Sequence, residues 1–426
     1  MVIISIGSHL AFYQIMTKNI DFGYTNTNYI PLDKRDSISL LLGAGFSVPM
    51  GYPTANTLAD SLLHLDDENI CFSPSGQLAI YLKQTRQNFI GEKSNYWQKV
   101  FTLCKRLIVA YKENRQTFDY EAFYDFLRDE TSQMKYAKYN QGLADGNHDY
   151  RSLLVNIKPV FNQIVAYFIE RRKYGCWIGK EPFTNYIEGY DGFLSCIKQW
   201  GKENIVNVHT LNHDTLFESF RNTEYLNDMV SDGFDEYGSD FYGLLKCGNK
   251  DFKVRLERYT ARYNKSIRLY KLHGSLDYVP FHRNTNKPKP FNTYIKIPYG
   301  INSGDLLRSC GRKMKYELSP FELHADFLTG TTSKMLRYGE PFYKNLFKRF
   351  RYNLRNAEKL IIIGYGCHDK GINDMIFENF DKSKPAFVVS PNPTSSINDF
   401  AQRINATILG MGVESITTKI FDKKIK

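Results

Sequence analysis

Paired cysteines are absent from this sequence, although it contains seven cysteines. They are isolated, odd in number and nowhere form a Cys-x-x-Cys pair; their positions are 71, 104, 176, 196, 247, 310 and 367. This spacing excludes a zinc ribbon and a disulfide framework, because both need cysteines at close, regular intervals. We therefore expect a reducing compartment and no bound metal.

Long hydrophobic runs are also lacking. The first sixteen residues are fairly apolar, but they contain His9, Tyr13 and Gln14, lack a basic start and do not end in a small-residue cleavage site. No apolar stretch approaches the ~20 residues needed to span a bilayer. These absences predict a cytoplasmic protein with no signal peptide and no membrane segment.

Low-complexity segments and internal repeats are missing as well. Hydrophobic residues make up 42% of the 426 positions and charged residues 24%, as is typical of a globular protein. The chain is long enough for two or three domains, or for one domain with large insertions. The 30 Tyr and 30 Phe are unusually many, and we interpret them as packing residues rather than base-stacking platforms.

The formal net charge is +11, but no long basic segment accounts for it. Lys and Arg are spread along the chain, and the clusters at 171–173, 348–349 and 423–426 are short. We therefore attribute the positive charge to ordinary solubility rather than to nucleic-acid binding, although a basic field would still attract an anionic ligand.

Five short apolar runs have the composition of strands buried on both faces of a sheet. Helical spacing follows several of them, as in Leu58 and Leu62, Leu216 and Phe220, and later Ile372 and Ile376. The pattern predicts an α/β fold with a Rossmann-like, doubly wound, mostly parallel sheet, whose ligand lies outside the carboxyl ends of the strands. The runs lie at 37–42, 205–208, 267–272, 360–363 and 386–389.

Two insertions are expected between these strands. In the first, apolar residues recur three and four apart, for example in 118–127 and 153–169, which predicts helices. We expect the Asp- and Gly-rich segment 231–236 to be a loop and the Pro-rich segment 280–290 to be an exposed connection. The expected boundaries are 1–36 for an N-terminal extension, 37–426 for the α/β domain, about 58–200 for the helical insertion and about 221–266 for the second insertion.

A glycine-containing loop follows the first apolar run. It begins with Gly43, Ala44 and Gly45, continues to Ser47, and includes further small or turn-forming residues at 51–54. Glycines let backbone amides approach a phosphate closely, because no Cβ blocks the approach. A Gly-x-Gly after a strand can also serve only as a tight turn, but the continuation of this loop favours phosphate binding.

His273 closes another apolar run. Gly274 and Ser275 follow it and allow the backbone to turn sharply, which would present the ring at the ligand edge of the sheet. A neutral imidazole, with an ordinary pKa near ~6.5, could act as a general base near neutral pH. The alternative is a buried histidine that only satisfies structural hydrogen bonds.

Asn212 and Asp214 follow a third run, two residues apart. An Asn can orient a water or a carboxamide, and an Asp can accept hydrogen bonds from ribose hydroxyls. An Asx turn or a helix cap is the alternative for this pair. Capping and helix-surface roles are likewise the alternatives for Asp369 and Asn373 at a fourth strand end.

Taken in order, these motifs resemble those of sirtuin-like proteins. The resemblance covers about 37–63 and 205–413 with gaps, and within that superfamily the chain looks most like the bacterial sirtuin-like NADases of antiphage defence. The motifs are Gly-Ala-Gly-x-Ser-x-x-x-Gly-x-Pro from Gly43, Thr-x-Asn-x-Asp from Thr210, Lys-Leu-His-Gly-Ser from Lys271 and Ile-Gly-Tyr-Gly-x-x-Asp-x-x-Ile-Asn from Ile363.

The resemblance implies that NAD binds as the substrate. His273 and Asn212 would be catalytic, the pyrophosphate would lie against the first glycine loop, and Asn392 would reach the adenosine half. The full set of implied NAD-contacting residues is Gly43, Ala44, Gly45, Ser47, Thr210, Asp214, Gly364, Tyr365, Gly366, Asp369, Asn373 and Asn392.

Two departures from the protein deacylases of this superfamily bear on the activity. The zinc-binding cysteine pairs are absent, and the Gly-x-Pro segment continues as Thr54-Ala55-Asn56 rather than Asp-Phe-Arg. We therefore expect hydrolysis of NAD to ADP-ribose and nicotinamide rather than transfer to acetyl-lysine. A non-catalytic sensor of NAD or ADP-ribose and an ADP-ribosyltransferase are the alternatives.

The resemblance and cellular logic together also predict regulation, because a constitutive NADase would poison its own cell. We expect a homo-oligomer, and as a partner either a defence-associated ATPase or a phage-derived activator.

Overall fold

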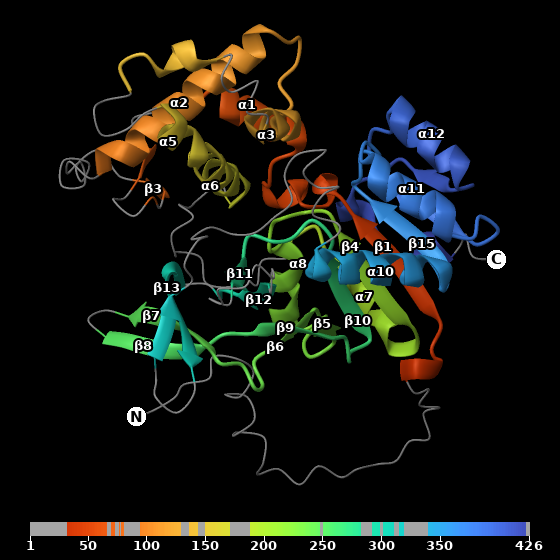
Figure 1. Ribbon diagram of the computed structural model, residues 1–426. Helices are drawn as coiled ribbons and strands as arrows, with labels where there is room; N and C mark the ends of the chain where they lie inside the picture. Colours follow the sequence, from red (N-terminus) through yellow and green to blue (C-terminus); the bar gives the residue numbers. More distant parts are fainter. Residues whose placement is uncertain are drawn as a thin grey trace.

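The computed structural model places the five predicted strands in one seven-stranded, fully parallel sheet (Figure 1). The spatial order is β17 (Thr407–Leu409), β16 (Ala386–Val389), β15 (Ala357–Ile363), β1 (Ser37–Leu42), β4 (Ile205–Thr210), β10 (Ile267–Lys271) and β5 (Val230–Ser231). The predicted doubly wound α/β fold is confirmed. The structure describes residues 32–65, 70–72, 76, 78–80, 94–128, 136–143, 150–170, 188–247, 250–282, 292–298, 301–310, 315–318 and 340–422.

Helices cover both faces of this sheet, which is why its strands are continuous apolar runs. Leu40 and Leu42 of β1 pack into the cluster that contains α7, whereas Leu41 between them packs into the cluster that contains α10. The covering helices are α7 (Asp191–Glu203) on one face and α10 (Pro341–Arg355), α11 (Lys370–Asn379) and α12 (Ser395–Arg403) on the other. Shorter helical elements are η1 (Leu32–Lys34), α8 (Leu216–Ser219), η6 (Phe220–Asn222), η7 (Val413–Ser415) and α13 (Thr418–Asp422).

The strand order reverses its direction beside β1. After β1 the chain forms β4 beside it, passes to β5 at the edge of the sheet and comes back to β10 between β4 and β5. It then crosses through α10 to β15 on the other side of β1 and continues to β16 and β17. In open parallel sheets this reversal leaves a crevice outside the carboxyl ends of the two central strands, where ligands bind. Here those strands are β1 and β15.

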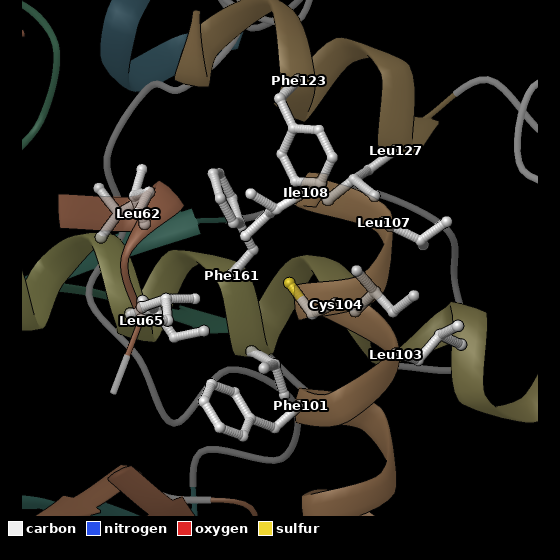
Figure 2. Close-up of a cluster of buried hydrophobic side chains, with 14 of the residues drawn as sticks. Leu62, Leu65, Phe101, Leu103, Cys104, Leu107, Ile108, Phe123, Leu127 and Phe161 are labelled. Carbon is white, nitrogen blue, oxygen red and sulfur yellow. The ribbon is translucent and has the colours of Figure 1, made fainter. Parts of the chain in front are cut away.

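A separate helical module lies between β1 and α7 in the chain, at the upper left of Figure 1. Figure 2 shows its core, in which Phe101 and Cys104 of α2 meet Phe123 of α3 and Phe161 of α6. In contrast, α7 belongs to the core of the sheet. The elements of the module are α1 (Ala55–Leu63), β2 (Ile70–Phe72), β3 (Leu78–Ile80), α2 (Ser94–Glu113), α3 (Tyr120–Arg128), η5 (Ala137–Asn140), α5 (Tyr150–Val155) and α6 (Ile157–Glu170).

One helical stretch in this module is apolar enough to cross a membrane by length and composition. Tyr150–Ile169 spans 20 residues with a mean hydropathy of 1.3. The expectation that no apolar stretch approaches this length is therefore wrong. However, 56% of the stretch is buried inside the protein, and Leu153 and Phe161 lie in the module core, so its apolar character is that of a core helix.

A β-rich module packs beside β10 and β5, and the sequence interpretation missed it. It consists of two four-stranded antiparallel sheets, β11-β12-β9-β6 and β14-β13-β7-β8. The strands are β6 (Gly233–Asp235), β7 (Phe241–Cys247), β8 (Lys250–Arg255), β9 (Arg258–Arg262), β11 (Tyr278–His282), β12 (Asn292–Lys296), β13 (Ile301–Cys310) and β14 (Lys315–Leu318).

Two loop predictions in this region need correction. Segment 231–236 is not a loop, since Ser231 ends β5 and Gly233–Asp235 form β6. Between them Asp232 is 4% exposed and pairs with Arg221 and Lys296, so the acidic residue marks a buried ion network rather than a solvated turn. In segment 280–290, residues 280–282 belong to β11 and Pro280 is buried; residues 283–290 lie outside the described part.

Candidate functional site

The register of the sheet aligns the ends of the five predicted strands. Leu42 of β1 pairs with Thr210 of β4 and with Ile363 of β15, Thr210 pairs with Lys271 of β10, and Ile363 pairs with Val389 of β16. Because all five strands are parallel, the loops that carry the predicted site residues leave the sheet side by side at its carboxyl edge.

The first glycine loop packs directly on the loop after β15. The Gly43 amide donates to the Ile363 carbonyl at 3.0 Å, and the Gly45 amide donates to the Gly364 carbonyl at 2.9 Å. Gly364 has a φ of +65°, and a Cβ there would lie 2.2 Å from the Phe46 nitrogen. Only glycine allows two backbones to approach so closely.

This contact changes which part of the loop a phosphate can reach. The amides of Gly43 and Gly45 already donate to backbone carbonyls, so these glycines serve the tight loop contact that was the structural alternative. Ala44 and Gly45 are nonetheless exposed. A ligand would therefore meet the outer surface of the loop rather than the Gly43 amide.

Asn212 links the strand end of β4 to the glycine loop. Its Nδ2 donates to the Gly43 carbonyl and to the Ser47 hydroxyl, both at 3.0 Å, and its own amide donates to Thr210 Oγ1 at 3.1 Å. Asn212 is half-buried, whereas Ser47 and Thr210 are buried. The amide side chain is therefore held in one orientation at the edge of the site.

Asp214 forms the Asx turn that was one of the alternatives for this residue. Its Oδ1 accepts from the Leu216 amide at 3.0 Å at the start of α8, and the residue is 7% exposed. Tyr190 of the sheet core, which carried no sequence motif, donates from its hydroxyl to the Phe46 carbonyl at 2.5 Å. Burial, and secondarily the charge of Asp214, raises the pKa of Tyr190, so the phenol is a fixed donor behind the glycine loop.

His273 leaves β10 and lies against the N-terminus of α11. Gly274 has a φ of +82°, the left-handed turn that the sequence predicted after the histidine. His273 is 4% exposed, and its Nε2 lies 3.5 Å from Asp369 Oδ2. The His213 ring lies nearby, with a centroid separation of 6.3 Å. A carboxylate in this position can orient the imidazole and stabilise its protonated form.

Tyr365, Asp369 and Asn373 hold the loop after β15 in shape. The Tyr365 hydroxyl donates to Asn373 Oδ1 at 2.8 Å and accepts from the Asp369 amide at 3.2 Å. Asn373 Nδ2 donates to the carbonyl of Cys367, whose φ is 60°. Asp369 Oδ1 also caps α11 through the Ile372 amide. The Tyr365 ring packs against Phe400 of α12, and the polar groups of Tyr365 and Asn373 bond within their own loop.

The remaining predicted residues lie farther from the contacts that Asn212 and His273 make. Gly366 is exposed on the same loop, and Asn392 is exposed beyond β16, two strands from β1. The structure therefore brings Asn212 into contact with the glycine loop and His273 close to Asp369, while Asn392 lies at the far side of the edge.

Two buried charged residues below His273 carried no assigned role in the sequence. Lys271 is 2% exposed, donates from Nζ to the Asp214 carbonyl, and lies 3.3 Å from Glu218 Oε1. Burial raises the pKa of Glu218, and the nearby charge of Lys271 partly opposes that rise. The sequence did indicate them, because Lys271 ends an apolar run. Burying an ammonium group costs free energy, so a lysine at such a position is expected to be paired.

Within the described ranges, no group of three or more His, Cys, Asp or Glu side chains is placed to hold a metal ion. Cys104, Cys196 and Cys367 are buried free thiols.

No protein-family model matches the sequence, and no curated protein matches it either. Solved structures with similarity include a Sir2 enzyme studied for its mechanism and regulation, with 12% identity and a TM-score of 0.34 over 92% of this chain and 93% of that one. A Sir2 homologue in complex with NAD has 10% identity and a TM-score of 0.34 over 92% and 89%. A sirtuin studied for substrate affinity has 11% identity and a TM-score of 0.34 over 92% and 96%. Because these sequence identities and TM-scores are low, the fold assignment rests on the strand order and register of this chain itself.

Proposed function

We propose that this protein is an NAD⁺ hydrolase that cleaves the bond between nicotinamide and ribose and releases nicotinamide and ADP-ribose. One observation carries the proposal. His273 and Asn212 leave adjacent strands at the carboxyl edge of the sheet, and Asn212 touches the glycine loop beside the point where the strand order reverses. The ordered sirtuin-like motifs and the missing cysteine pairs support the same activity.

Cleavage of the bond between nicotinamide and ribose needs little general acid catalysis. As the C1′–N bond breaks, its electron pair moves to the nicotinamide nitrogen, the leaving group becomes neutral, and positive charge develops on the ribose. Rate enhancement then comes from orientation and from electrostatic stabilisation of that charge. A carboxylate and an amide oxygen are suitable groups, and Asp369 and Asn212 would supply them.

His273 would act on the nucleophile. A water forms the new bond to C1′ and gives its proton to the imidazole, directly or through a ribose hydroxyl. The Asp369 carboxylate, 3.5 Å from Nε2, would stabilise the imidazolium that results. Asn212, fixed by Gly43 and Ser47, would hold the water or the carboxamide in place.

The decisive experiment follows nicotinamide and ADP-ribose by chromatography after NAD is added to the purified protein. His273→Ala and Asn212→Ala should each lower the rate at least ~100-fold, the usual contribution of a positioned acid–base group for the first and of a positioned hydrogen-bonding group for the second. The control is His64→Ala, because His64 is exposed at the C-terminal cap of α1 and contacts Asp60. A His273→Ala protein that consumes NAD at the wild-type rate would exclude this assignment.

The same assay separates the alternatives. A sensor would bind NAD or ADP-ribose without turnover, and a transferase would make labelled ADP-ribose acid-precipitable. Free ADP-ribose in equal amount to nicotinamide supports hydrolysis.

We further propose that the activity is regulated and serves antiphage defence in the cytoplasm. The helical module, with a core distinct from the sheet, is the element through which self-assembly, a defence-associated ATPase or a phage-derived activator would act. NAD turnover should rise steeply with protein concentration or on addition of the activator. High activity that is constant under all these conditions would contradict regulation.

A further inference from the structure

Lys271 connects the two loops that carry the proposed catalytic residues. It is the last residue of β10, two positions before His273, and its side chain is 1% exposed. Its ammonium donates to the carbonyl of Asp214, two positions after Asn212. One buried side chain therefore spans from the strand end of His273 to the loop of Asn212.

Other hydrogen bonds join the same two loops. The Leu272 amide donates to the Thr210 carbonyl at 2.9 Å, and the Leu276 amide donates to the His213 carbonyl at 3.0 Å. The Ser275 hydroxyl also donates to the His213 carbonyl, at 3.5 Å. Lys271 adds a charged donor at the end of this ladder. Charge-assisted hydrogen bonds are stronger than neutral ones, so this link is the strongest of the four.

A lysine is a costly choice for this position if only packing matters. Taking an ammonium out of water is unfavourable, and an apolar side chain of the same length would fill the same space. Glu218 supplies the opposite charge at 3.3 Å, but in the described structure neither of its carboxylate oxygens accepts a hydrogen bond. Glu218 thus compensates the charge of Lys271, whereas the hydrogen bond of Lys271 is directed at the Asp214 backbone.

We propose that Lys271 is a positioning residue, which fixes the Asn212 loop relative to His273, and that Glu218 is its counter-ion. The effect on catalysis rests on the proposed NAD cleavage, but the effect on the two loops does not.

The test compares Lys271→Met, Glu218→Gln and the double variant with the wild type. Lys271→Met alone removes the cation that pairs with Glu218, leaving the weaker effects of Lys296 and Arg221, and should lower the Tm. The double variant removes both charges with side chains of similar size, and its Tm should recover most of that loss, because replacing a whole buried pair costs far less than leaving one charge unpaired. The part that is not recovered is the cost of the Asp214 carbonyl, which still lacks its donor.

Positioning predicts that catalysis does not recover together with stability. The double variant, assayed well below its Tm, should keep a kcat at least ~10-fold below wild type with KM changed less than about threefold, because misplacing reacting groups acts on the transition state. Glu218→Gln, which retains the Lys271 donor, should keep a kcat within about threefold of wild type. If the double variant gives too little folded protein, Lys271→Met at low temperature replaces it in the same comparison.

Amide hydrogen exchange gives a readout that needs no activity. Segments 211–215 and 272–276 should exchange faster in the double variant, while the α2 and α6 amides exchange as in the wild type. Wild-type kcat, or wild-type exchange in these segments, in a double variant with restored Tm would overturn the proposal. A wild-type protein that does not cleave NAD would refute the proposed function, and the exchange result would still decide the role of Lys271.

Discussion

The helical module and the carboxyl edge of the sheet bury different kinds of side chain. The module core is almost entirely apolar, with Phe101, Phe123 and Phe161 packed around Cys104 (Figure 2). The region below His273 buries Glu218, Lys271, Asp232 and Lys296 instead.

Apolar cores tolerate substitutions that conserve volume, whereas removing one member of a buried charged pair leaves the other charge uncompensated. Single substitutions in the charged region should therefore act through lost pairing rather than through lost volume. We expect the two regions to respond to substitution in opposite ways.

The largest effect should come from His273→Ala at the carboxyl edge. We expect NAD turnover to fall at least ~100-fold, because the proposed role of the ring is to accept a proton. The ring is 4% exposed, so the Tm should also fall, and turnover is therefore compared per folded molecule. Turnover and thermal unfolding measured on one preparation test this. A large loss of Tm with normal turnover per folded molecule would show that His273 is structural.

Phe161→Ala tests the apolar core of the helical module. This side chain is fully buried in the module core, so its removal should reduce the free energy of unfolding by about 3–5 kcal/mol. Turnover per folded molecule should stay near wild type. Val109→Ala on α2 is the control, because Val109 is 48% exposed and should change stability by less than about 0.5 kcal/mol. Equal effects in denaturant unfolding would contradict the apolar-core interpretation.

Gly364→Ala examines the contact between the loops of β1 and β15. The new Cβ would meet the Phe46 nitrogen at 2.2 Å and also sit at a positive φ. Gly51→Ala is matched in φ, at +82°, but its Cβ would meet nothing within 4 Å. We expect about 1–2 kcal/mol for Gly51→Ala from backbone strain alone and a larger loss for Gly364→Ala, measured by urea unfolding. Similar losses would show that the two loops can separate without penalty.

The most gradual effect is a pH dependence from His209, a buried residue of β4 that packs against Phe350 of α10. Its Nδ1 bonds the Leu40 carbonyl at 3.0 Å and its Nε2 lies 3.0 Å from Asn353 Nδ2, so we assign a neutral ring that donates from Nδ1 and accepts at Nε2. Burial lowers the pKa of His209 from 6.5 to about 3.

The sign of the pH effect follows from this depressed pKa. Between pH 6.5 and 3 the unfolded chain binds a proton that the folded chain rejects, so the stability contributed by neutral His209 is present above pH 6.5 and is lost as the pH falls. The slope should reach at most about 1.4 kcal/mol per pH unit. His209→Gln should remove this part of the slope in urea unfolding, and His64→Gln on the surface should not.

Much of the fold was predictable because its signals are local. Continuous apolar runs such as 360–363 and 386–389 are typical of strands that are buried on both faces, and these two runs lie in β15 and β16. Gly274 was predictable for the same reason, since a sharp turn after a buried strand needs a residue that accepts a positive φ. The β-rich module was missed because its strands mix polar and apolar residues, as in Lys250–Arg255.

The candidate site was predictable only in part. The sequence by itself determined which residues follow each strand end, and parallel pairing then places them on one edge. Only the tertiary structure decided that Asn212 bonds the glycine loop, that Asp369 approaches His273, and that Lys271 reaches Asp214. These contacts join segments tens to hundreds of residues apart, so no local pattern encodes them. They arise from strand order, register and the burial of charge, which exist only once the chain has folded.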